Sequence, residues 1–488
     1  MATPYKTPGV YIEEVATLPP SVVPVETAIP AFLGYTENTQ SQGQALLHRP
    51  VAVDSLLEFQ QVFGGPPVLG GFTVTLDADG LVVDGVSDPN AGPSARFRLA
   101  HALRTYFDNG GGRCYIVSLG DYAAPGTTAE VVSSHDAALG ALAKEDEPTL
   151  IVLPDLSSIA PTDPEDADQV AAARASYHGV LSRALNQCAD LGDRFLICDL
   201  WDGDAEGPGA VDAFRNGIGT RNLRYGAAYH PSLHTTLGWT YDEDTVTIAQ
   251  TARRGDDGTV TRPSPLDGLT LAALRTGPDA DTQAYGAVRA ALDRYGVTLP
   301  PAAAVAGVFA TVDRTRGVWK APANESLSSV RSPAVEVDQD LNDHMNVHPT
   351  GKSVNALRTF AGKGLLVWGG RTLAGNDNEW RYVSVRRFFN FAEESIRNAT
   401  EAFVFEPNDA RTWTKVKALI ESFLTLQWRQ GALAGAKPED AFYVRVGLGS
   451  TMGPQDVLEG RMIVEIGMAV VRPAEFIVLR FSHLLQGS

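Results

Sequence analysis

The sequence contains few cysteines and no long apolar run. Its three cysteines, Cys114, Cys188 and Cys198, are too few for a disulfide framework, and none forms a C-x-x-C pair typical of a zinc site. Each lies among apolar residues, which predicts reduced thiols buried in the core of a protein synthesised in the cytoplasm. No apolar run approaches the roughly 18 residues of a membrane span, and Met1–Lys6 lacks the apolar segment of a signal peptide. We therefore expect cytoplasmic assembly, and release from the cell only by lysis or within a larger particle.

Basic residues are also scarce relative to acidic ones. The chain of 488 residues carries 40 Lys and Arg against 58 Asp and Glu, a net charge of −18. Such a surface repels phosphate backbones and anionic lipids, which excludes nucleic acid and direct membrane binding as expected activities. Hydrophobic residues make up 44% of the chain, enough for the core of a soluble protein with two to four domains.

The first 30 residues predict an extended arm. Prolines interrupt every candidate helix and favour extended backbone at the residue before each of them. They are Pro4, Pro8, Pro19, Pro20, Pro24 and Pro30. Between them, Val10–Glu13 has room for one short strand, which cannot bury itself alone and must join a sheet formed elsewhere. An edge strand within its own domain is the alternative.

Short apolar runs alternate with helical patterns between about residues 100 and 230. The runs are 114–119, 149–153, 195–200 and 223–229, and the helical patterns lie near 135–144, 170–191 and 209–217. This alternation predicts βαβ units and a mainly parallel sheet. Before it, 31–35 predicts a strand, 55–63 a short helix, and 72–83 a hairpin that turns at Asp79-Gly80. After it, residues 232–300 predict a variable region and 302–315 a helix returning to the C-terminal domain.

The last third of the chain has the most regular pattern. Strands are expected at 364–369, 380–383, 442–446 and 476–481, with a further apolar run at 461–471. Two amphipathic helices lie between them. The first carries apolar residues at spacings of three and four, namely Val385, Phe389, Ala392, Ile396, Ala399 and Phe403. The second begins after Asn408 or Asp409 as its cap, buries Trp413 and Val416 on its apolar face, and ends at Gly431 in a left-handed conformation.

Several segments, in this order, resemble the contractile tail sheath protein family of myophage tails, R-type bacteriocins and extracellular contractile injection systems. The C-terminal segments are VNALRTFAGKGLLVWGGRTL, EWRYVSVRRFFNFAEESI, FVFEPNDARTW, GALAGAKPEDAFYVRVG and RPAEFIVLRFSH. Residues 8–15 are similar to the opening of the family, and 106–115 to its first-domain pattern. The resemblance is close at both ends and over about the last third of the chain, and loose in the middle.

The resemblance implies a multidomain fold of α/β and α+β type. We expect an extended N-terminal arm at residues 1–30 and an outer α/β domain at 31–300, with variable insertions at about 65–95 and 232–280. A C-terminal α+β core domain at 301–472, completed by the N-terminal arm, and a C-terminal strand at 473–488 would follow. The family resemblance further implies that these arms add strands to the sheets of neighbouring subunits.

Two groups of residues are candidate interface residues. The strand arms comprise Pro8, Gly9, Val10, Tyr11, Ile12, Glu13, Phe476, Ile477, Val478, Leu479 and Phe481. Exposed strand edges recruit other chains, although pairing of both strands within one subunit is the alternative. The helix over 410–430 carries outward basic residues, Arg411, Lys415, Lys417 and Arg429, which the resemblance places against an inner tube. A solvated helix face is the alternative.

We expect no catalytic, cofactor or metal site. Gly351-Lys352-Ser353 is similar to the end of a phosphate-binding loop, but Asn346 stands where its first glycine belongs and Pro349 intrudes. Asp343, His344 and His348 are conceivable metal ligands, yet a solvated loop is the favoured reading there. The triplet at Gly110 precedes a strand instead of following one, which is the wrong order for a dinucleotide cradle.

The hypothesis is therefore a non-enzymatic structural subunit of a contractile sheath, without cofactors. Its expected partners are identical subunits, an inner tube protein, and baseplate and terminal cap proteins. A nucleotide-binding α/β enzyme built on residues 100–230 is the alternative from another class, and a capsid or adhesin-type structural protein is a third.

Overall fold

The computed structural model describes residues 22–80, 82–88, 97–123, 126–254, 260–262 and 264–479. It divides the chain into two compact units. Unit 1 comprises residues 1–25 and 392–471, and unit 2 comprises 26–391 and 472–488. The predicted arm strand at Pro8, Gly9, Val10, Tyr11, Ile12 and Glu13 lies outside the described residues, as does Phe481.

A nine-stranded sheet forms the centre of unit 2, in the order β18-β21-β20-β11-β10-β9-β1-β8-β4. Its strands are β1 (Pro30–Gly34), β4 (Pro50–Val53), β8 (Cys114–Ser118), β9 (Leu150–Val152), β10 (Phe195–Cys198), β11 (Gly226–His230), β18 (Glu325–Ser326), β20 (Val354–Phe360) and β21 (Gly364–Val367). The six strands from β20 to β8 in this order are parallel to one another, whereas β4, β21 and β18 pair antiparallel at the two edges. The prediction of a mainly parallel sheet over this region is confirmed.

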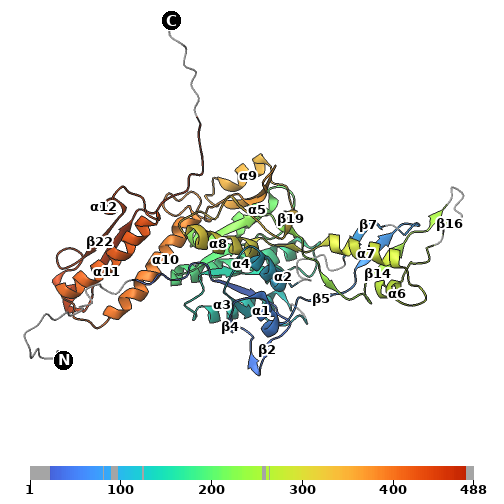
Figure 1. Ribbon diagram of the computed structural model, residues 1–488, viewed down its shortest axis with the longest axis horizontal. Helices are drawn as coiled ribbons and strands as arrows, with labels where there is room; N and C mark the ends of the chain where they lie inside the picture. The colour runs from blue at the N-terminus through green and yellow to red at the C-terminus, as the bar shows by residue number, and fades with distance from the viewer. Residues whose placement is uncertain are drawn as a thin grey trace, which may run out of the picture. The chain divides into compact units, whose positions relative to one another are not determined.

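Helices cover both faces of this sheet (Figure 1). One face packs against α1 (Leu56–Phe63), α2 (Leu99–Asp108) and α8 (Ala302–Arg316), and the other against α3 (Thr128–Leu142), α4 (Ala167–Leu191) and α5 (Gly209–Gly217). Alternation along the strands explains the two layers. In β8, Cys114 and Ile116 belong to the first core and Tyr115 and Val117 to the second. All three cysteines are buried free thiols, as predicted.

Helix α8 belongs to this sheet and not to a separate C-terminal domain. Its residues from Ala302 to Ala310 are buried on every side, because a helix of alanine, valine and glycine has no polar face to turn to water. Strand β20 likewise continues the parallel sheet beside β11. The expected boundary at residue 300 therefore does not coincide with the division between the units, which falls within α10 (Val383–Thr400).

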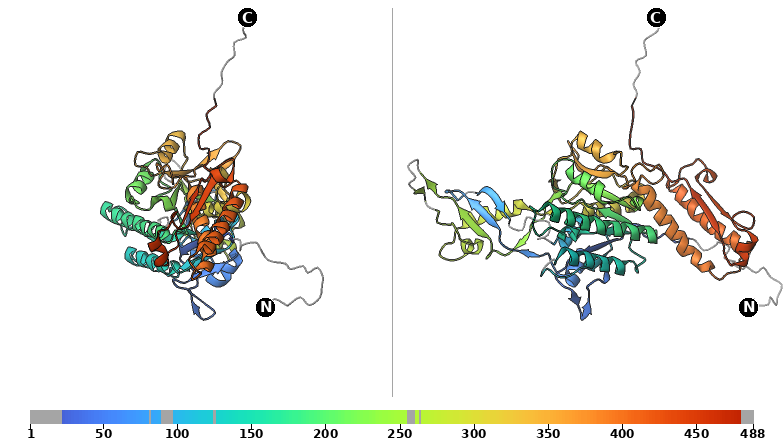
Figure 2. Two further views of the ribbon diagram at one scale, coloured as in Figure 1. Left: turned by 90° about the vertical axis from the view of Figure 1, so that its left-hand side faces the viewer. Right: turned by 180° about the vertical axis from the view of Figure 1, so that it is seen from behind.

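The two segments expected as insertions pack together in a small lobe of unit 2. Their apolar side chains, among them Phe72, Val74 and Ile248, form one core with side chains of the following helix, such as Val288. The elements are β5 (Val68–Leu69), β6 (Thr73–Leu76), β7 (Val82–Ser87), β13 (Thr240–Tyr241), β14 (Thr247–Gln250), β15 (Arg253–Arg254), β16 (Val260–Arg262), α6 (Leu271–Arg275) and α7 (Thr282–Tyr295). Figures 1 and 2 show them projecting from one end of the sheet. Strands β6 and β7 form the expected hairpin, with Gly80 at a φ of 77°.

The remaining elements of unit 2 are short. They are β2 (Gln40–Ser41), β3 (Gln44–Ala45), η2 (Pro154–Ser158), η3 (Leu223–Tyr225), β12 (Leu233–Thr235), β17 (Thr298–Leu299), β19 (Val330–Pro333) and α9 (Gln339–Asn346). The strand expected at 380–383 is wrong. Only an isolated bridge joins Tyr382 to Arg371, and α10 begins at Val383, because the main-chain groups of this segment are used to enter the helix.

Unit 1 consists of the last turns of α10, a long helix and a two-stranded sheet. Its other elements are η4 (Glu401–Phe403), α11 (Ala410–Arg429), α12 (Pro438–Ala441), β22 (Phe442–Val446), α13 (Pro454–Leu458) and β23 (Val464–Met468). Asp409 caps α11 by accepting hydrogen bonds from the N–H groups of Arg411 and Thr412, and Gly431 follows its end with a φ of 91°. Both ends match the prediction. Trp413 is only half-buried, because its indole N–H reaches out to the amide oxygen of Asn408 at 2.7 Å.

Candidate interface surfaces

The C-terminal segment is attached to unit 2 through the carboxylate of Glu475. Arg371 donates to both of its oxygens, with N–O distances of 2.8 and 2.6 Å. Asn346 donates a third hydrogen bond at 2.9 Å, and the hydroxyl of Tyr382 a fourth at 3.2 Å. The Arg371 side chain is 4% exposed, so its guanidinium depends on Glu475 for its counter-charge.

Burial and hydrogen bonding act on Glu475 in opposite directions. Burial raises its pKa, but the donors from Arg371 and Asn346 outweigh this and hold the pKa below the usual value of a glutamate. The carboxylate is therefore ionised at neutral pH. This four-donor contact, the Glu475 anchor, fixes the point from which the terminal segment leaves the domain.

The residues directly after the anchor are exposed. Phe476, Ile477, Val478 and Leu479 have exposed fractions from 69% to 78%, and they form no strand within the described part of this single chain. Four consecutive apolar side chains in water are unfavourable, at roughly 1.5 to 3 kcal/mol for each large side chain that remains unburied. Such a segment is suited to burial against another surface.

The N-terminal segment enters unit 2 through a second buried ion pair. Arg387 of α10 donates to Asp313 of α8 at 3.0 and 2.5 Å, and the two side chains are 3% and 6% exposed. Thr27 joins both, since its hydroxyl donates to Asp313 at 2.6 Å and its carbonyl accepts from Arg387 at 2.8 Å. We call this contact the Asp313 anchor.

The sheet of unit 1 has only two strands among the described residues. Strands β22 and β23 pair antiparallel from Phe442–Met468 to Val446–Val464. A two-stranded ribbon leaves unpaired N–H and C=O groups along both outer edges, which are sites where further strands can add. The apolar side chains of Val464 and Ile466, which lie on one face of β23, are half-exposed.

The basic residues predicted on α11 point outward. Arg411, Lys415, Lys417 and Arg429 are all exposed, whereas Val416, Ile420, Phe423 and Leu424 are buried on the opposite face. Lys417 lies 3.7 Å from Glu421 one turn on, an exposed pair that contributes little to stability. The helix thus exposes four basic residues, three in its first two turns and one in its last, on an otherwise acidic protein.

Known proteins match both the C-terminal region and the whole chain. The family model described as the phage tail sheath C-terminal domain matches residues 375–483. Structures of the anti-feeding prophage (AFP), in its helical sheath in the contracted state and in its baseplate, are 30% identical with a TM-score of 0.61, and each match covers at least 98% of both chains. The sheath complex of the PVC extracellular contractile injection system, also contracted, is 28% identical with a TM-score of 0.62 over 99% of this chain and 98% of that one.

The chain belongs to the contractile tail sheath protein family. The tail sheath protein of Vibrio phage KVP40 is 26% identical over 187 residues, which is 38% of this chain. The match spans 26% of that longer phage protein, so this sheath protein corresponds to about a quarter of its length. The family membership supports a structural role as a sheath subunit and gives no support to a nucleotide-binding enzyme.

In an α/β enzyme the substrate binds at the carboxyl edge of the parallel sheet. In this sheath protein, acidic residues at that edge accept hydrogen bonds from main-chain N–H groups and stabilise the fold. Asp199 follows β10 and accepts from the N–H of Ala302 at 2.8 Å, which caps α8. Asp155 follows β9 and accepts from the N–H groups of Tyr35, Arg98 and Leu99. Burial raises the pKa of Asp199 to about 7 and that of Asp155 to about 6.

The residues resembling a phosphate-binding loop are occupied by internal contacts. The ammonium of Lys352 donates to the carbonyl of Arg215, and Arg215 Nε donates to the carbonyl of Lys352 at 2.9 Å. The hydroxyl of Ser353 donates to the carbonyl of Asn346 at 2.6 Å. The side-chain donors of Lys352 and Ser353 are thus directed at main-chain carbonyls of unit 2.

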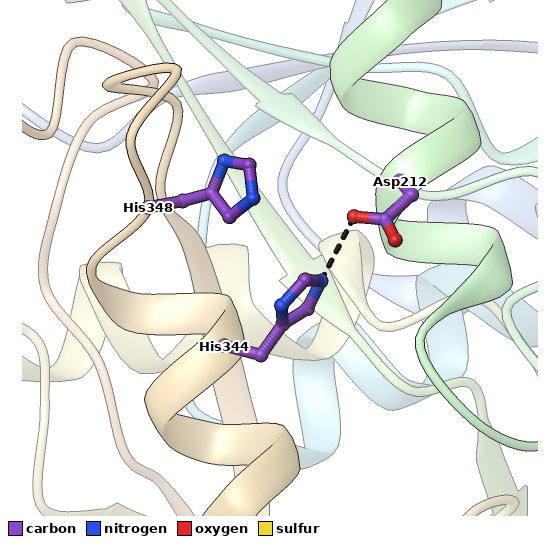
Figure 3. Close-up of side chains that lie close together, drawn as sticks. All are labelled: Asp212, His344 and His348. Atoms are coloured by element: carbon purple, nitrogen blue, oxygen red, sulfur yellow. Dashed lines mark hydrogen bonds and ion pairs between the residues drawn. The ribbon is translucent and has the colours of Figure 1, made fainter.

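The expectation of a solvated loop around His344 is wrong in part. Helix α9 extends to Asn346 and carries His344 on its last turn, because Asp338 caps the helix through the N–H of Leu341. His344 and His348 then meet Asp212 of α5, and not Asp343, which accepts from Gln339 (Figure 3). Sequence reasoning did not find Asp212, which lies 132 residues from His344.

The anchor residues were likewise missed by sequence reasoning. Arg371, Glu475, Asp313 and Arg387 are ordinary charged residues in segments noted only for their apolar patterns.

Proposed function

We propose that this sheath protein polymerises with identical copies around an inner tube, in an extended and metastable state, and contracts to drive the tube through a target envelope. The observation that carries the proposal is the match along nearly the whole chain to a helical sheath in its contracted state. No fuel or cofactor is needed, because the energy of a bistable set of interfaces is stored during assembly.

The terminal segments are proposed to link neighbouring subunits. Residues 8–15 and 475–483 would add strands to the β22–β23 sheet of adjacent copies, whose two edges are open among the described residues of one chain. The Glu475 and Asp313 anchors support this role, since each ties the base of a terminal segment to the rigid core of unit 2. A segment held firmly at its base transmits the pull of a neighbour to the domain.

The exposed basic residues of α11, Arg411, Lys415, Lys417 and Arg429, are proposed to face the inner tube. Exposed lysines and arginines opposite an acidic tube surface would form many weak contacts, each worth at most about 1 kcal/mol and screened by salt. Contacts of this kind hold the tube in register and release it without a large barrier. The remaining proposed partners are baseplate and terminal cap proteins, within a particle that assembles in the cytoplasm and is released from the cell.

Negative-stain microscopy of the purified protein tests polymerisation. We expect hollow tubes from the full chain, and soluble monomers from a chain lacking residues 1–20. A matched control is a substitution series in the projecting lobe, such as Thr73→Ala and Thr247→Ala, which leaves both termini intact and is expected to assemble normally. Undiminished assembly without residues 1–20 would reject strand exchange by this arm, and absence of any polymer from the full chain at high concentration would reject the sheath function.

A further inference from the structure

We propose that Asp212, His344 and His348 bind a divalent transition-metal ion, with the chemistry of Zn²⁺, that clips α5 to the loop after α9. One ligand atom from each of the three side chains lies within 4.8 Å of the other two. The residues come from two elements far apart in the sequence, and Figure 3 shows their polar atoms directed toward a common point. Two imidazoles and one carboxylate suit Zn²⁺ and its neighbours in the first transition row, and do not suit Ca²⁺ or Mg²⁺.

Asp212 and His344 already meet in the cluster. His344 Nε2 lies 2.8 Å from Asp212 Oδ1 and 3.1 Å from Arg215 Nη1, which itself lies 3.4 Å from Asp212 Oδ1. Without a cation, the Nε2–H tautomer of His344 and the guanidinium of Arg215 both donate to the Asp212 carboxylate. A metal ion would replace the Nε2 proton and bind both the imidazole and the carboxylate.

His348 is oriented for ligation by its other nitrogen. Its Nδ1 lies 2.9 Å from the hydroxyl oxygen of Thr350 and 3.3 Å from the Thr350 main-chain nitrogen, whose N–H donates to it. Binding of an ion through Nε2 requires the Nδ1–H tautomer, in which the hydroxyl oxygen accepts the hydrogen bond from Nδ1 and the Thr350 N–H gives up this acceptor. A hydrogen bond from the distal ring nitrogen is the usual support of a metal-binding histidine.

Arg215 both supports and opposes the site. Its Nε and Nη2 donate to the main-chain carbonyls of Lys352, His344 and Met345, at 2.9, 2.6 and 2.9 Å. The guanidinium, which is 1% exposed, therefore locks α5 to the end of α9 before any ion arrives. Only Nη1 faces the cluster. The positive charge of the guanidinium disfavours a second cation there, so a bound metal ion has to displace Nη1 from His344 and Asp212.

Acidic side chains offset this repulsion. The hollow beside His344 is lined by Glu206, Glu336, Asp338 and Asp340. Together with Asp212 they produce a local negative potential that attracts a cation from solvent. Asp212 and His344 are 45% and 30% exposed, so an ion reaches them without unfolding.

The geometry requires a small rearrangement. Zn²⁺ with bonds of about 2.0 to 2.1 Å holds its ligands about 3.3 Å apart. The Asp212 and His344 ligand atoms are 2.8 Å apart and have to separate by about 0.5 Å to admit the ion, while rotation of His348, which stands on the loop after α9, brings in the third ligand. Water would take the fourth position.

Zinc titration of the metal-stripped full chain tests the inference independently of sheath assembly. We expect one Zn²⁺ per chain by calorimetry, and the visible absorption of tetrahedral Co²⁺ when cobalt replaces zinc. His348→Gln, His344→Gln and Asp212→Asn should each weaken binding by about 10- to 100-fold or more, and Thr350→Val by about 10-fold through loss of the outer hydrogen bond. His234→Gln removes an exposed histidine outside the cluster and should bind as the parent does.

His348→Gln is the decisive variant, because among the described residues its side chain contacts Thr350 and the cluster, and its loss spares the core. Circular dichroism of each variant verifies the fold. Failure of the folded parent chain to bind zinc, or equal binding by the parent and folded His348→Gln, would overturn the inference and leave Asp212 and His344 as an ordinary ion pair.

Discussion

Arg371 and Glu475 lie 104 residues apart and form a two-point ion pair that closes the base of the C-terminal segment onto unit 2. The pair joins the segment that follows β21 to the C-terminal segment, whose next four residues, Phe476 to Leu479, are exposed and apolar. The Asp313–Arg387 pair does the same for the N-terminal segment. Both ends of the described chain are thus attached to unit 2 by buried ion pairs.

Glu475→Gln should release the C-terminal segment. The amide retains hydrogen-bonding capacity but removes the counter-charge of buried Arg371, at a cost of about 3 kcal/mol. Amide hydrogen exchange at Arg371 and Thr372, whose N–H groups donate to the side chain of Asn355 and the carbonyl of Arg381, should then accelerate by roughly 100-fold, as expected for this loss of local stability. The exposed Glu379→Gln makes the same charge change and should leave exchange there unaltered; equal protection in both variants would count against the anchor.

Asp313→Asn should destabilise the whole of unit 2. The substitution leaves Arg387 buried without a full counter-charge between α8 and α10, which costs about 3 kcal/mol in the free energy of unfolding. Urea unfolding followed by tryptophan fluorescence measures this change. Asp136→Asn breaks an exposed pair with Arg183 and should cost no more than about 1 kcal/mol. An equal loss in the free energy of unfolding for Asp313→Asn and Asp136→Asn would show that burial of the Asp313–Arg387 pair does not determine its contribution to stability.

Asp199→Asn should alter the pH dependence of stability. Burial raises the pKa of Asp199 from 3.8 to about 7, so the folded state binds the proton more tightly than the unfolded state does. The stability contributed by this group is complete below about pH 4 and is lost as the pH rises toward 7. Asparagine cannot ionise, and its oxygen still accepts from the N–H of Ala302.

The variant should therefore gain about 2 kcal/mol relative to the parent between about pH 5 and pH 8. Urea midpoints at these two pH values provide the measurement, and Asp168→Asn at an exposed position is the control. If the free energy of unfolding depended on pH in the same way for the parent and Asp199→Asn, the raised pKa of Asp199 would be contradicted.

Lys415→Glu with Lys417→Glu should weaken association of the sheath with its tube. The double reversal changes the charge of the exposed α11 face by four and also sets residue 417 against Glu421. Co-sedimentation of sheath and tube should fall, and its dependence on salt should diminish. Lys144→Glu with Lys363→Glu makes an equal change on exposed sites of unit 2, where normal co-sedimentation is expected. Unchanged tube binding by the α11 variant would remove this helix from the interface.

Phe405→Asn should raise stability while weakening assembly. Phe405 is fully exposed at a φ of 70°, a left-handed conformation that costs a bulky residue about 1 kcal/mol and asparagine less. An exposed aromatic ring held in strained backbone is suited to burial by a partner. Val404→Asn, at a φ of −64°, should give no stabilisation. A thermal melt and a polymerisation assay separate the two effects, and unimpaired assembly would show that the ring is not at a contact.

Local patterns in the sequence predicted most of the elements correctly. The parallel strands, the hairpin turning at Gly80, and α11 from its Asp409 cap to Gly431 depend on neighbours within a few residues, which the sequence displays directly. The errors arose where distant residues decide. The segment 380–383 pairs with no strand. Helix α8 packs on the large sheet because that sheet and its other helices can bury all sides of an apolar helix.

What the sequence determined by itself is the periodicity of each segment, the caps and turns between them, the prolines of the first 30 residues and the apolar run at 476–479. Only the tertiary structure decided which charges meet: Arg371 with Glu475, Asp313 with Arg387, and Asp212 with His344. The physical reason is that a helix or strand forms from contacts a few residues apart, whereas an ion pair depends on where the sheet brings residues separated by dozens or hundreds of positions.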